Sequence, residues 1–191
     1  MSRDPSNGYD AIADQFISVR SDAGHQIVSD WAKSLQQKAS VIDIGAGPGE
    51  PITSALVENY CTVWALDASP TMVDAFKARF PDIEIACEAA EQSSFFDRTF
   101  DGAIAIGLMF LLAETAQRDL IESISKALKP GGRFLFSAPV ETGTWEDTLT
   151  GNLSRSLGLA AYKRALMDAG FHLMDQFVDE GGSNYYSTQK R

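Results

Sequence analysis

A glycine-rich turn between an apolar run and a helix-forming run most constrains how this chain can fold. Its sequence is Val41-Ile42-Asp43-Ile44-Gly45-Ala46-Gly47-Pro48-Gly49-Glu50. Glycine lacks a Cβ and adopts positive φ readily, so the three glycines let the backbone bend tightly and approach a ligand. The helix that follows offers free N–H groups and a partial positive charge. The pattern predicts a strand, a ligand-contacting turn and a helix, in that order.

The spacing of these glycines argues against a dinucleotide site. The dinucleotide fingerprint G-x-G-x-x-G requires glycine at position 50, where this chain has Glu50. A carboxylate at the start of the helix repels a pyrophosphate. The spacing G-x-G-x-G therefore favours a ligand that carries a nucleoside and no phosphate.

Apolar runs and helical patterns alternate along most of the chain. Strands are expected at residues 40–44, 62–67, 83–87, 99–106 and 133–138, and helices at 9–19, 24–37, from 70, from 115 or 116 to 128, and 156–169. This alternation predicts an α/β fold with a mostly parallel sheet covered on both faces. Residues 171–178 and 184–189 flank a tight loop and are expected to pair antiparallel. Residues 141–156 are polar and turn-rich, and no element is predicted there.

Composition limits the classes of partner. The 191 residues are 45% hydrophobic and carry a formal net charge of −10. One domain is therefore expected, and neither nucleic acid nor an anionic membrane is expected as a partner. There is no apolar run of about 20 residues and no signal-peptide core, so a cytoplasmic protein is expected. Cys61 and Cys87 are expected to be buried free thiols, and the scattered Cys and His residues predict no metal site.

Four segments, in order, resemble the motifs of the class I S-adenosylmethionine (SAM)-dependent methyltransferases. Residues 43–49 are similar to the glycine-rich first motif, 67–72 to the acidic end of the second strand, 100–105 to the fourth strand, and 128–135 to the entry to the fifth. The resemblance covers residues 9–190. It implies a doubly wound three-layer sandwich around a mostly parallel seven-stranded sheet with a C-terminal antiparallel hairpin. It also implies one domain over 1–191, with a helical lid at 1–38 and a Rossmann-like core at 39–191.

The resemblance implies SAM as cofactor and S-adenosylhomocysteine (SAH) as product, bound over the carboxyl ends of the strands. The residues expected to contact the cofactor are Tyr9, Arg20, Asp43, Gly45, Ala46, Gly47, Gly49, Asp67, Ala68, Met72, Glu88, Ala89, Ile106 and Gly107.

Several of these residues have alternative roles. Asp67 can accept both ribose hydroxyls, or it can cap the following helix. Glu88, with the Ala89 N–H, suits the adenine edge, or it is a solvated loop acid. Arg20 can fork onto the methionyl carboxylate, which Tyr9 would help to enclose, or it forms a surface ion pair. Asp43 binds the cofactor's amino group through water or orients the loop.

The acceptor implied by the resemblance is a small molecule. Phe110 and Trp145, which follow the fourth and fifth strands, are candidates for an apolar pocket wall. No catalytic residue is assigned, because a sulfonium methyl is already activated and positioning supplies much of the rate. Ile106-Gly107-Leu108-Met109 does not match the Asn/Asp-Pro-Pro-Tyr/Phe motif of relatives that methylate amino groups of nucleobases or glutamine. The local acids suit an amine, but the acceptor atom and the oligomeric state stay open.

Two other functions are compatible with parts of the pattern. A non-catalytic SAM-binding or regulatory module would bind the cofactor and transfer no methyl group. An oxidoreductase that uses NAD or flavin would share the sheet, but Glu50 stands against it.

Overall fold

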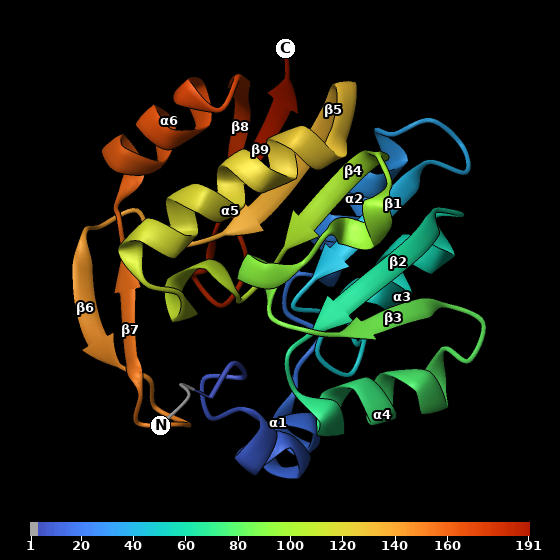
Figure 1. The fold of residues 1–191 in the computed structure, drawn as a ribbon, viewed down its shortest axis with the longest axis vertical. Helices are drawn as coiled ribbons and strands as arrows, with labels where there is room; N and C mark the ends of the chain where they lie inside the picture. Colours follow the sequence, from blue (N-terminus) through green and yellow to red (C-terminus); the bar gives the residue numbers. More distant parts are fainter. Residues whose placement is uncertain (1–3) are drawn as a thin grey trace.

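A seven-stranded sheet forms the centre of the computed structural model, which describes residues 4–191 (Figure 1). The strand order is β3-β2-β1-β4-β5-β9-β8, with the first five strands parallel and β9 antiparallel to both of its neighbours. The strands are β1 (Ser40–Ile44), β2 (Thr62–Asp67), β3 (Glu84–Cys87), β4 (Phe100–Ala105), β5 (Leu128–Ser137), β8 (Phe171–Val178) and β9 (Asn184–Lys190). The predicted α/β fold with a C-terminal antiparallel pair is confirmed.

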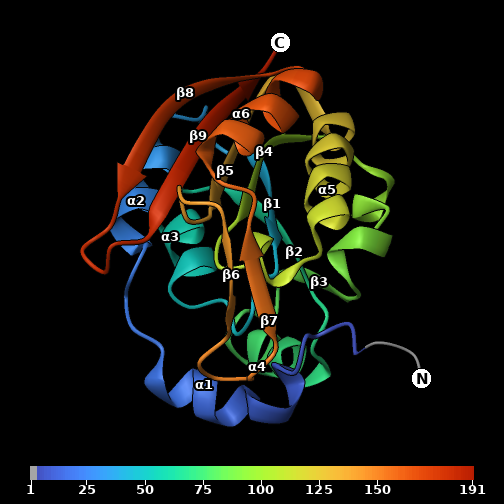
Figure 2. The ribbon, with the colours of Figure 1, turned by 90° about the vertical axis from the view of Figure 1, so that its left-hand side faces the viewer.

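Helices cover both faces of this sheet. Figures 1 and 2 show α5 (Glu114–Ala127) and α6 (Leu159–Asp168) on one face, and α2 (His25–Lys33) and α3 (Ile52–Glu58) on the other. Helix α4 (Pro70–Arg79) packs beside β2 and β3. Helix α1 (Ala13–Val19) follows a single 3-10 turn, η1 (Asp10–Ile12), and lies beyond the sheet. Three more 3-10 turns are η2 (Ala90–Gln92), η3 (Phe95–Asp97) and η4 (Met109–Leu111).

The core is divided by the sheet, because neighbouring residues of a strand point to opposite faces. Ile42 on β1 faces the larger cluster with α5 and α6, whereas Val41 faces the cluster with α2 and α3. In the larger cluster the buried Tyr162 hydroxyl donates to Gln117 Oε1 at 2.6 Å. Both faces of the strands are therefore apolar, as the near-continuous hydrophobic runs predicted.

The position of the turn in the sheet makes it a ligand site. The chain leaves β1 toward β2 on one side, while β4 pairs with the other side of β1, so the strand order reverses there. In open α/β sheets, ligands bind outside the carboxyl ends of the strands at this reversal. These ends point toward α1 in Figure 1.

A second, two-stranded sheet occupies the polar stretch in which no element was predicted. Strands β6 (Gly143–Glu146) and β7 (Leu153–Ser156) pair antiparallel, and β7 packs on η4. The β6–β7 hairpin is mostly exposed and polar, so it lacks the apolar alternation that marks a strand in a sequence. Its tip reaches the end of the molecule where α1 lies (Figure 2).

Three local expectations were wrong. The helix expected at residues 156–169 begins only at Leu159, because Ser156 ends β7 and its Oγ accepts the N–H of Gly158. The strand expected at residues 133–138 begins earlier, at Leu128, directly after α5. Cys61 and Cys87 are both free, but Cys61 is half-buried and Cys87 is exposed. Burial raises the pKa of the Cys61 thiol to about 11.

Gly49 has a packing role that differs from its expected ligand contact. It adopts φ +86°, and a Cβ there would clash with the Phe80 ring and lie 3.0 Å from the Phe76 ring. The absence of a side chain at Gly49 thus lets the aromatic residues of the α4 segment close against the turn.

We predict that Gly49→Ala destabilises the fold more than Gly170→Ala. Gly170 has nearly the same φ, +87°, but open space where a Cβ would stand. Both variants carry the left-handed strain of about 1–2 kcal/mol. Only Gly49→Ala adds overpacking, worth about 1–3 kcal/mol. Urea unfolding measures the difference, and equal losses of stability would contradict the packing role.

Candidate functional site

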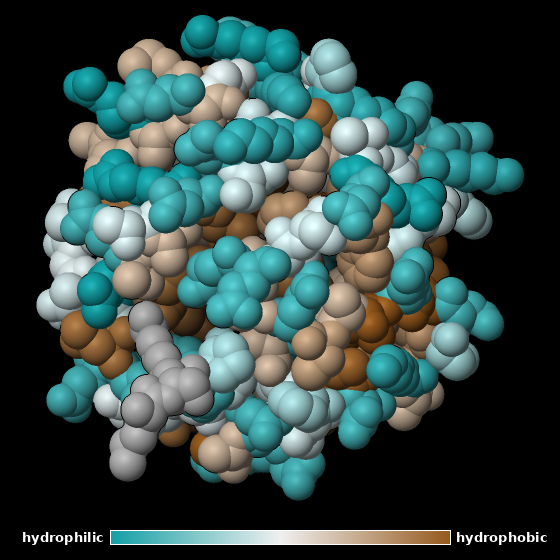
Figure 3. Space-filling model, in the orientation of Figure 1, coloured by the Kyte–Doolittle hydropathy of each residue, from teal (hydrophilic) through white to brown (hydrophobic). Residues whose placement is uncertain are grey.

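A cavity of about 320 Å³ lies over the carboxyl ends of the parallel strands. This volume is in the range of sites for small molecules and cofactors. Figure 3 shows hydrophilic side chains over much of the visible face, with apolar ones largely recessed between them. The walls come from five parts of the chain: residues 5–20, the turn at 45–50, the ends of β2 and β3, the segment 106–112, and the loop 147–149.

Two glycines give the cavity a wall of bare backbone. Gly47 has φ +56° and Gly107 has φ +77°, and a Cβ at either position would meet no atom within 4 Å. The N–H groups of Gly45 and Ala46 both donate to the Leu66 carbonyl, at 2.8 and 3.0 Å, which holds the turn to β2. Of the predicted turn residues, Gly45, Ala46 and Gly47 line the cavity and Gly49 lies behind it.

Asp67 joins the turn to the end of β2. One carboxylate oxygen accepts the Gly47 N–H and the other accepts the Ser69 N–H, both at 2.8 Å. Burial raises the pKa of Asp67, and these hydrogen bonds oppose that rise. Each oxygen keeps a free lone pair for a ligand. Helix α4 is capped by Ser69, whose Oγ accepts the Met72 N–H, so the alternative role of Asp67 as the cap is not observed.

Asp43 lies beneath the cavity and does not line it. The side chain is fully buried on β1, and the Thr53 hydroxyl donates to Oδ2 at 2.6 Å. This bond ties the end of the strand to the first turn of α3, as expected for a residue that orients the loop. Burial raises the pKa of Asp43 to about 7, while the Thr53 bond and the charge of Arg20 oppose the rise.

Arg20 lies in the cavity wall rather than in a surface ion pair. Its Nε donates to the Glu50 carbonyl at 3.3 Å, and its guanidinium lies 5.4 Å from the centre of the Phe16 ring. Burial lowers the pKa of Arg20, but an arginine stays charged in proteins. Phe16 lines the cavity, and its ring meets the Tyr9 ring edge-to-face with the ring centres 5.4 Å apart.

The remaining predicted cofactor contacts mostly meet in the same place. Ala68, Met72, Glu88, Ile106 and Gly107 line the cavity, whereas Ala89 lies behind its wall. The Glu88 N–H donates to the Asp67 carbonyl at 3.0 Å, which brings the ends of β2 and β3 together. Glu88 is therefore a partly buried cavity acid and not a fully solvated loop residue.

The two predicted substrate residues are stacked, with one behind the other. Phe110 lines the cavity, and the Trp145 ring packs on it from the hairpin, with the ring centres 5.9 Å apart. The expectation that Trp145 lines the pocket is wrong, because the register of β6 places it against Phe110. It supports the wall instead of forming it.

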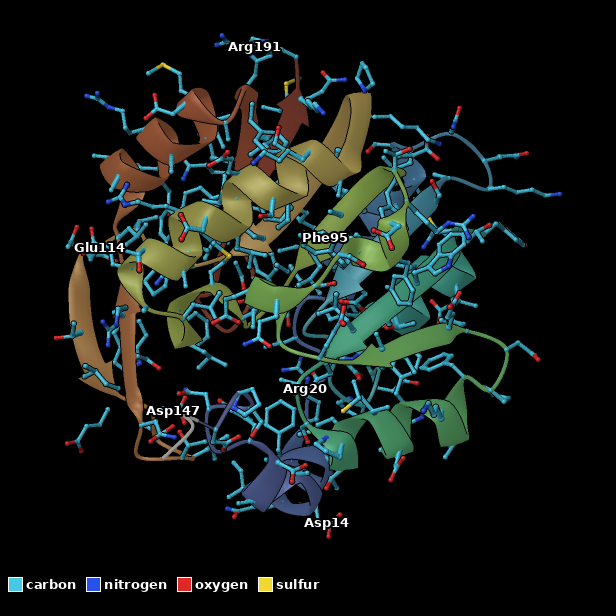
Figure 4. The ribbon with its side chains drawn as sticks, in the orientation of Figure 1. Asp14, Arg20, Phe95, Glu114, Asp147 and Arg191 are labelled. Atoms are coloured by element: carbon cyan, nitrogen blue, oxygen red, sulfur yellow. The ribbon has the colours of Figure 1, made fainter. Side chains whose placement is uncertain are left out.

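Sequence reasoning did not assign a role in the site to the loop at the hairpin tip. Asp147 is buried, and its Oδ2 accepts the Tyr9 hydroxyl at 3.1 Å. Asn152 Nδ2 donates to the Asn7 carbonyl at 2.7 Å. The sequence carries no signal for these contacts, which join segments 138 and 145 residues apart. Figure 4 shows Arg20 and Asp147 at the same end of the molecule, close to α1.

The described part of the chain, residues 4–191, contains neither a metal-binding cluster nor a membrane-spanning helix. No group of three or more His, Cys, Asp or Glu side chains in this part of the chain is placed to hold a metal ion. No helix in residues 4–191 is long and apolar enough to cross a membrane.

Comparison with known proteins identifies the central part of the chain. The model of a family described as a methyltransferase domain matches residues 41–132. Over these residues the chain is similar to that family. The match contains the glycine turn, Asp67 and β4, and it ends inside β5.

A curated relative and two solved structures extend this comparison. An uncharacterized methyltransferase of Mycobacterium tuberculosis is 32% identical to the chain over 93 residues, which are 49% of this chain and 37% of that protein. The match thus spans little more than a third of the relative's length. The 1,6-didemethyltoxoflavin-N1-methyltransferase of Burkholderia thailandensis has a TM-score of 0.74 at 20% identity, over 97% of this chain and 90% of that chain. An amino pentose methyltransferase from Micromonospora echinaspora also has a TM-score of 0.74, at 15% identity over 95% and 96%.

These structural likenesses establish the fold of the whole chain. The segment 41–132 and the β5–β9–β8 part of the sheet together have the fold of these solved methyltransferases, as the resemblance implied. The Burkholderia structure contains SAH and the Micromonospora structure contains SAM.

We predict that the stability of this protein depends on the protonation of Asp43. Its pKa is about 7 in the folded state, against an ordinary value of 3.8. A raised carboxyl pKa leaves stability intact below about pH 4 and lowers it as the pH rises toward about 7, because the carboxyl of the unfolded chain then ionises while the buried one stays protonated. Asp43→Asn should remove this loss, which is on the order of 4 kcal/mol. Urea unfolding between pH 4 and pH 8 measures it.

Asp101→Asn is a control, because the pKa of Asp101 is lowered and its effect on the pH dependence of stability is opposite to that of Asp43. Although burial raises the pKa of Asp101, the Lys129 and Ser40 contacts hold it at about 2. Its contribution to stability is therefore present at neutral pH and lost as the pH falls from about 4 toward 2. If Asp43→Asn shows the same pH dependence as the unmodified protein, the assignment to Asp43 is wrong.

Proposed function

We propose that this protein transfers a methyl group from SAM to a small-molecule acceptor. The observation that carries the proposal is the Asp67 carboxylate at the end of β2, beside the bare backbone of Gly47 and Gly107. A carboxylate with free lone pairs can accept hydrogen bonds from both hydroxyls of a vicinal diol. Glycine backbone without a Cβ lets a ligand approach the main chain closely. SAM carries both a ribose diol and an amino-acid group that such surfaces can bind.

The cavity walls suggest how SAM is held. Asp67 accepts the ribose hydroxyls, while Ala68 and Met72 pack on the nucleoside and Glu88 accepts from the adenine amino group. Arg20, oriented by the Glu50 carbonyl and the Phe16 ring, pairs with the methionyl carboxylate. The Ile106 carbonyl and Gly107 lie along the methionyl amine. Asp43 does not touch SAM in this proposal, but it holds the glycine turn in place by accepting the Thr53 hydroxyl.

The N-terminal segment serves as a lid in this proposal. Asn7, Tyr9 and Phe16 line the cavity from the side opposite the sheet. The predicted lid covers residues 1–38, of which the first three lie outside the described part of the chain. Closure of this segment excludes water and holds the acceptor in line with the sulfonium methyl, which SAM supplies already activated. Such positioning is worth about 7–11 kcal/mol of a reaction barrier.

Neighbouring structures are consistent with a small acceptor. The Burkholderia structure contains a bound 1,6-didemethyltoxoflavin, the Micromonospora enzyme is named for an amino pentose, and another neighbour is a glycopeptide N-methyltransferase. An oxidoreductase is less well supported, because Glu50 lines the cavity where a pyrophosphate would lie. A non-catalytic SAM-binding module differs from an enzyme only in turnover. SAH release during incubation with SAM and a metabolite panel separates these two.

We predict that Asp67→Asn weakens the binding of SAM and SAH by at least about tenfold, since a hydrogen bond to a charged group contributes about 1.5–3 kcal/mol. The asparagine keeps one oxygen for the loop N–H groups but loses the charge and an acceptor. Asp74→Asn, on the exposed side of α4, is the matched control and should bind as the unmodified protein does. Isothermal titration calorimetry measures both, and the absence of SAM and SAH binding in the unmodified protein would refute the proposal.

A further inference from the structure

One end of the cavity shares only Tyr9 with the residues that were expected to contact SAM. Its walls are the N-terminal segment at Asn7 and Tyr9, the loop at Asp147 and Leu149, and Phe110 after β4. The parts come from three distant regions of the chain, and the loop at the hairpin tip supplies Asp147 and Leu149. We refer to these five residues as the acceptor end of the cavity.

The acceptor end combines an apolar surface with a built polar anchor. Phe110, backed by Trp145, and Leu149 provide the apolar surface. The anchor is Asp147, whose Oδ1 accepts the N–H groups of Leu149 and Thr150 at 3.0 and 2.8 Å. These bonds fix the side chain in the loop. Its Oδ2 accepts the Tyr9 hydroxyl and keeps a second lone pair for a ligand donor.

A second polar group faces the same space. Asn7 has φ +53°, and its carbonyl is held by Asn152. The Asn7 Nδ2 is buried and has no hydrogen-bond partner within residues 4–191. Buried donors are rarely left unpaired, so this amide is available to an acceptor atom of a ligand.

The charges of the cavity favour one class of acceptor. Its wall carries five carboxylates, and among the described lining residues Arg20 is the single cation; the acids are Glu50, Asp67, Glu88, Glu91 and Asp147. Arg20 donates to the Glu50 carbonyl, and the proposed function uses it for the methionyl carboxylate, although its charge also reaches Tyr9. A carboxylate or phosphate on the acceptor would meet Asp147 with no cation beside it, at a high desolvation cost. A protonated amine would instead meet the opposite charge of the Asp147 carboxylate.

We propose that the acceptor is an amine on an apolar, ring-sized body, bound through its nitrogen to Asp147 and Tyr9. The inference rests on the proposed function and names its substrate class. The ring lies against Phe110 and Leu149, and the N–H group donates to Asp147 Oδ2. The bound ammonium first gives one proton to Asp147, which passes it to solvent. The freed nitrogen lone pair then forms the new N–C bond as the methyl–sulfur bond breaks, and the electron pair of that broken bond stays on sulfur, giving SAH and the methylated ammonium.

The test compares matched ligands on the complex of the protein with SAH. Benzylamine, phenethylamine and tryptamine are titrated beside the alcohols and carboxylic acids of the same carbon skeletons. We expect the amines to bind more tightly than their alcohols in at least one skeleton, and no carboxylic acid to bind. Tighter binding of an alcohol or an acid than of every amine, or no binding of any amine, would overturn the proposal.

Asp147→Asn separates binding from loop structure. Its Oδ1 still accepts the loop N–H groups, whereas the charge and the Oδ2 acceptor of the Tyr9 hydroxyl are lost. Glu146→Gln, one residue earlier and exposed outside the cavity, removes the same charge from the hairpin. We expect amine binding to weaken by at least about tenfold in Asp147→Asn and to be unchanged in Glu146→Gln. Equal amine binding in both variants would refute the role of Asp147.

The SAH titration distinguishes this inference from the proposed function. The unmodified protein, Asp147→Asn and Glu146→Gln are each titrated with SAH. If all three bind SAH but amines bind no more tightly than the matched alcohols, the amine class is wrong and the methyltransferase proposal stands. If the unmodified protein binds neither SAM nor SAH, both are wrong.

Discussion

The carboxylate of Asp67 is the interaction on which the site depends. It binds the N–H of Gly47 in the turn after β1 and the N–H of Ser69 before α4, so it connects two neighbouring strand ends and the helix between β2 and β3. Those hydrogen bonds offset the cost of burying the carboxylate, which would otherwise favour its neutral form. Asp43 lies below it and repels it electrostatically. The glycine turn is thus held in place by a charge that is also available to a ligand.

The parts of the site that could be predicted from the sequence are those encoded locally. The turn, Asp67 and Glu88 each follow a strand, and parallel strands bring their carboxyl ends to one edge of a sheet, so local patterns sufficed to group them. Gly49 shows the limit of this reasoning, because a glycine in a motif can make room for a ligand or for a neighbouring side chain. Only the position of the Phe80 ring shows that it serves packing.

The parts that could not be predicted depend on distant contacts and on register. No local property of Tyr9 or Asp147 indicates that their side chains meet. The hairpin that carries Asp147 is polar, and hydrophobic periodicity therefore gave no strand there. Trp145 and Phe110 were both predicted as pocket walls, and the two rings are in contact, but only Phe110 lines the cavity. Local sequence does not determine this, because a shift of one residue in a strand reverses which face a side chain occupies.

The contact between the N-terminal segment and the hairpin tip has a consequence for how the protein is made. Strand β1 and the turn are synthesised early relative to Asp147 and Asn152, which follow their partners Tyr9 and Asn7 by 138 and 145 residues. Contacts of such high sequence separation form late because they carry a large loop-closure cost. Until the hairpin tip meets Asn7 and Tyr9, the acidic cavity therefore lacks the wall that Asp147 and Leu149 supply.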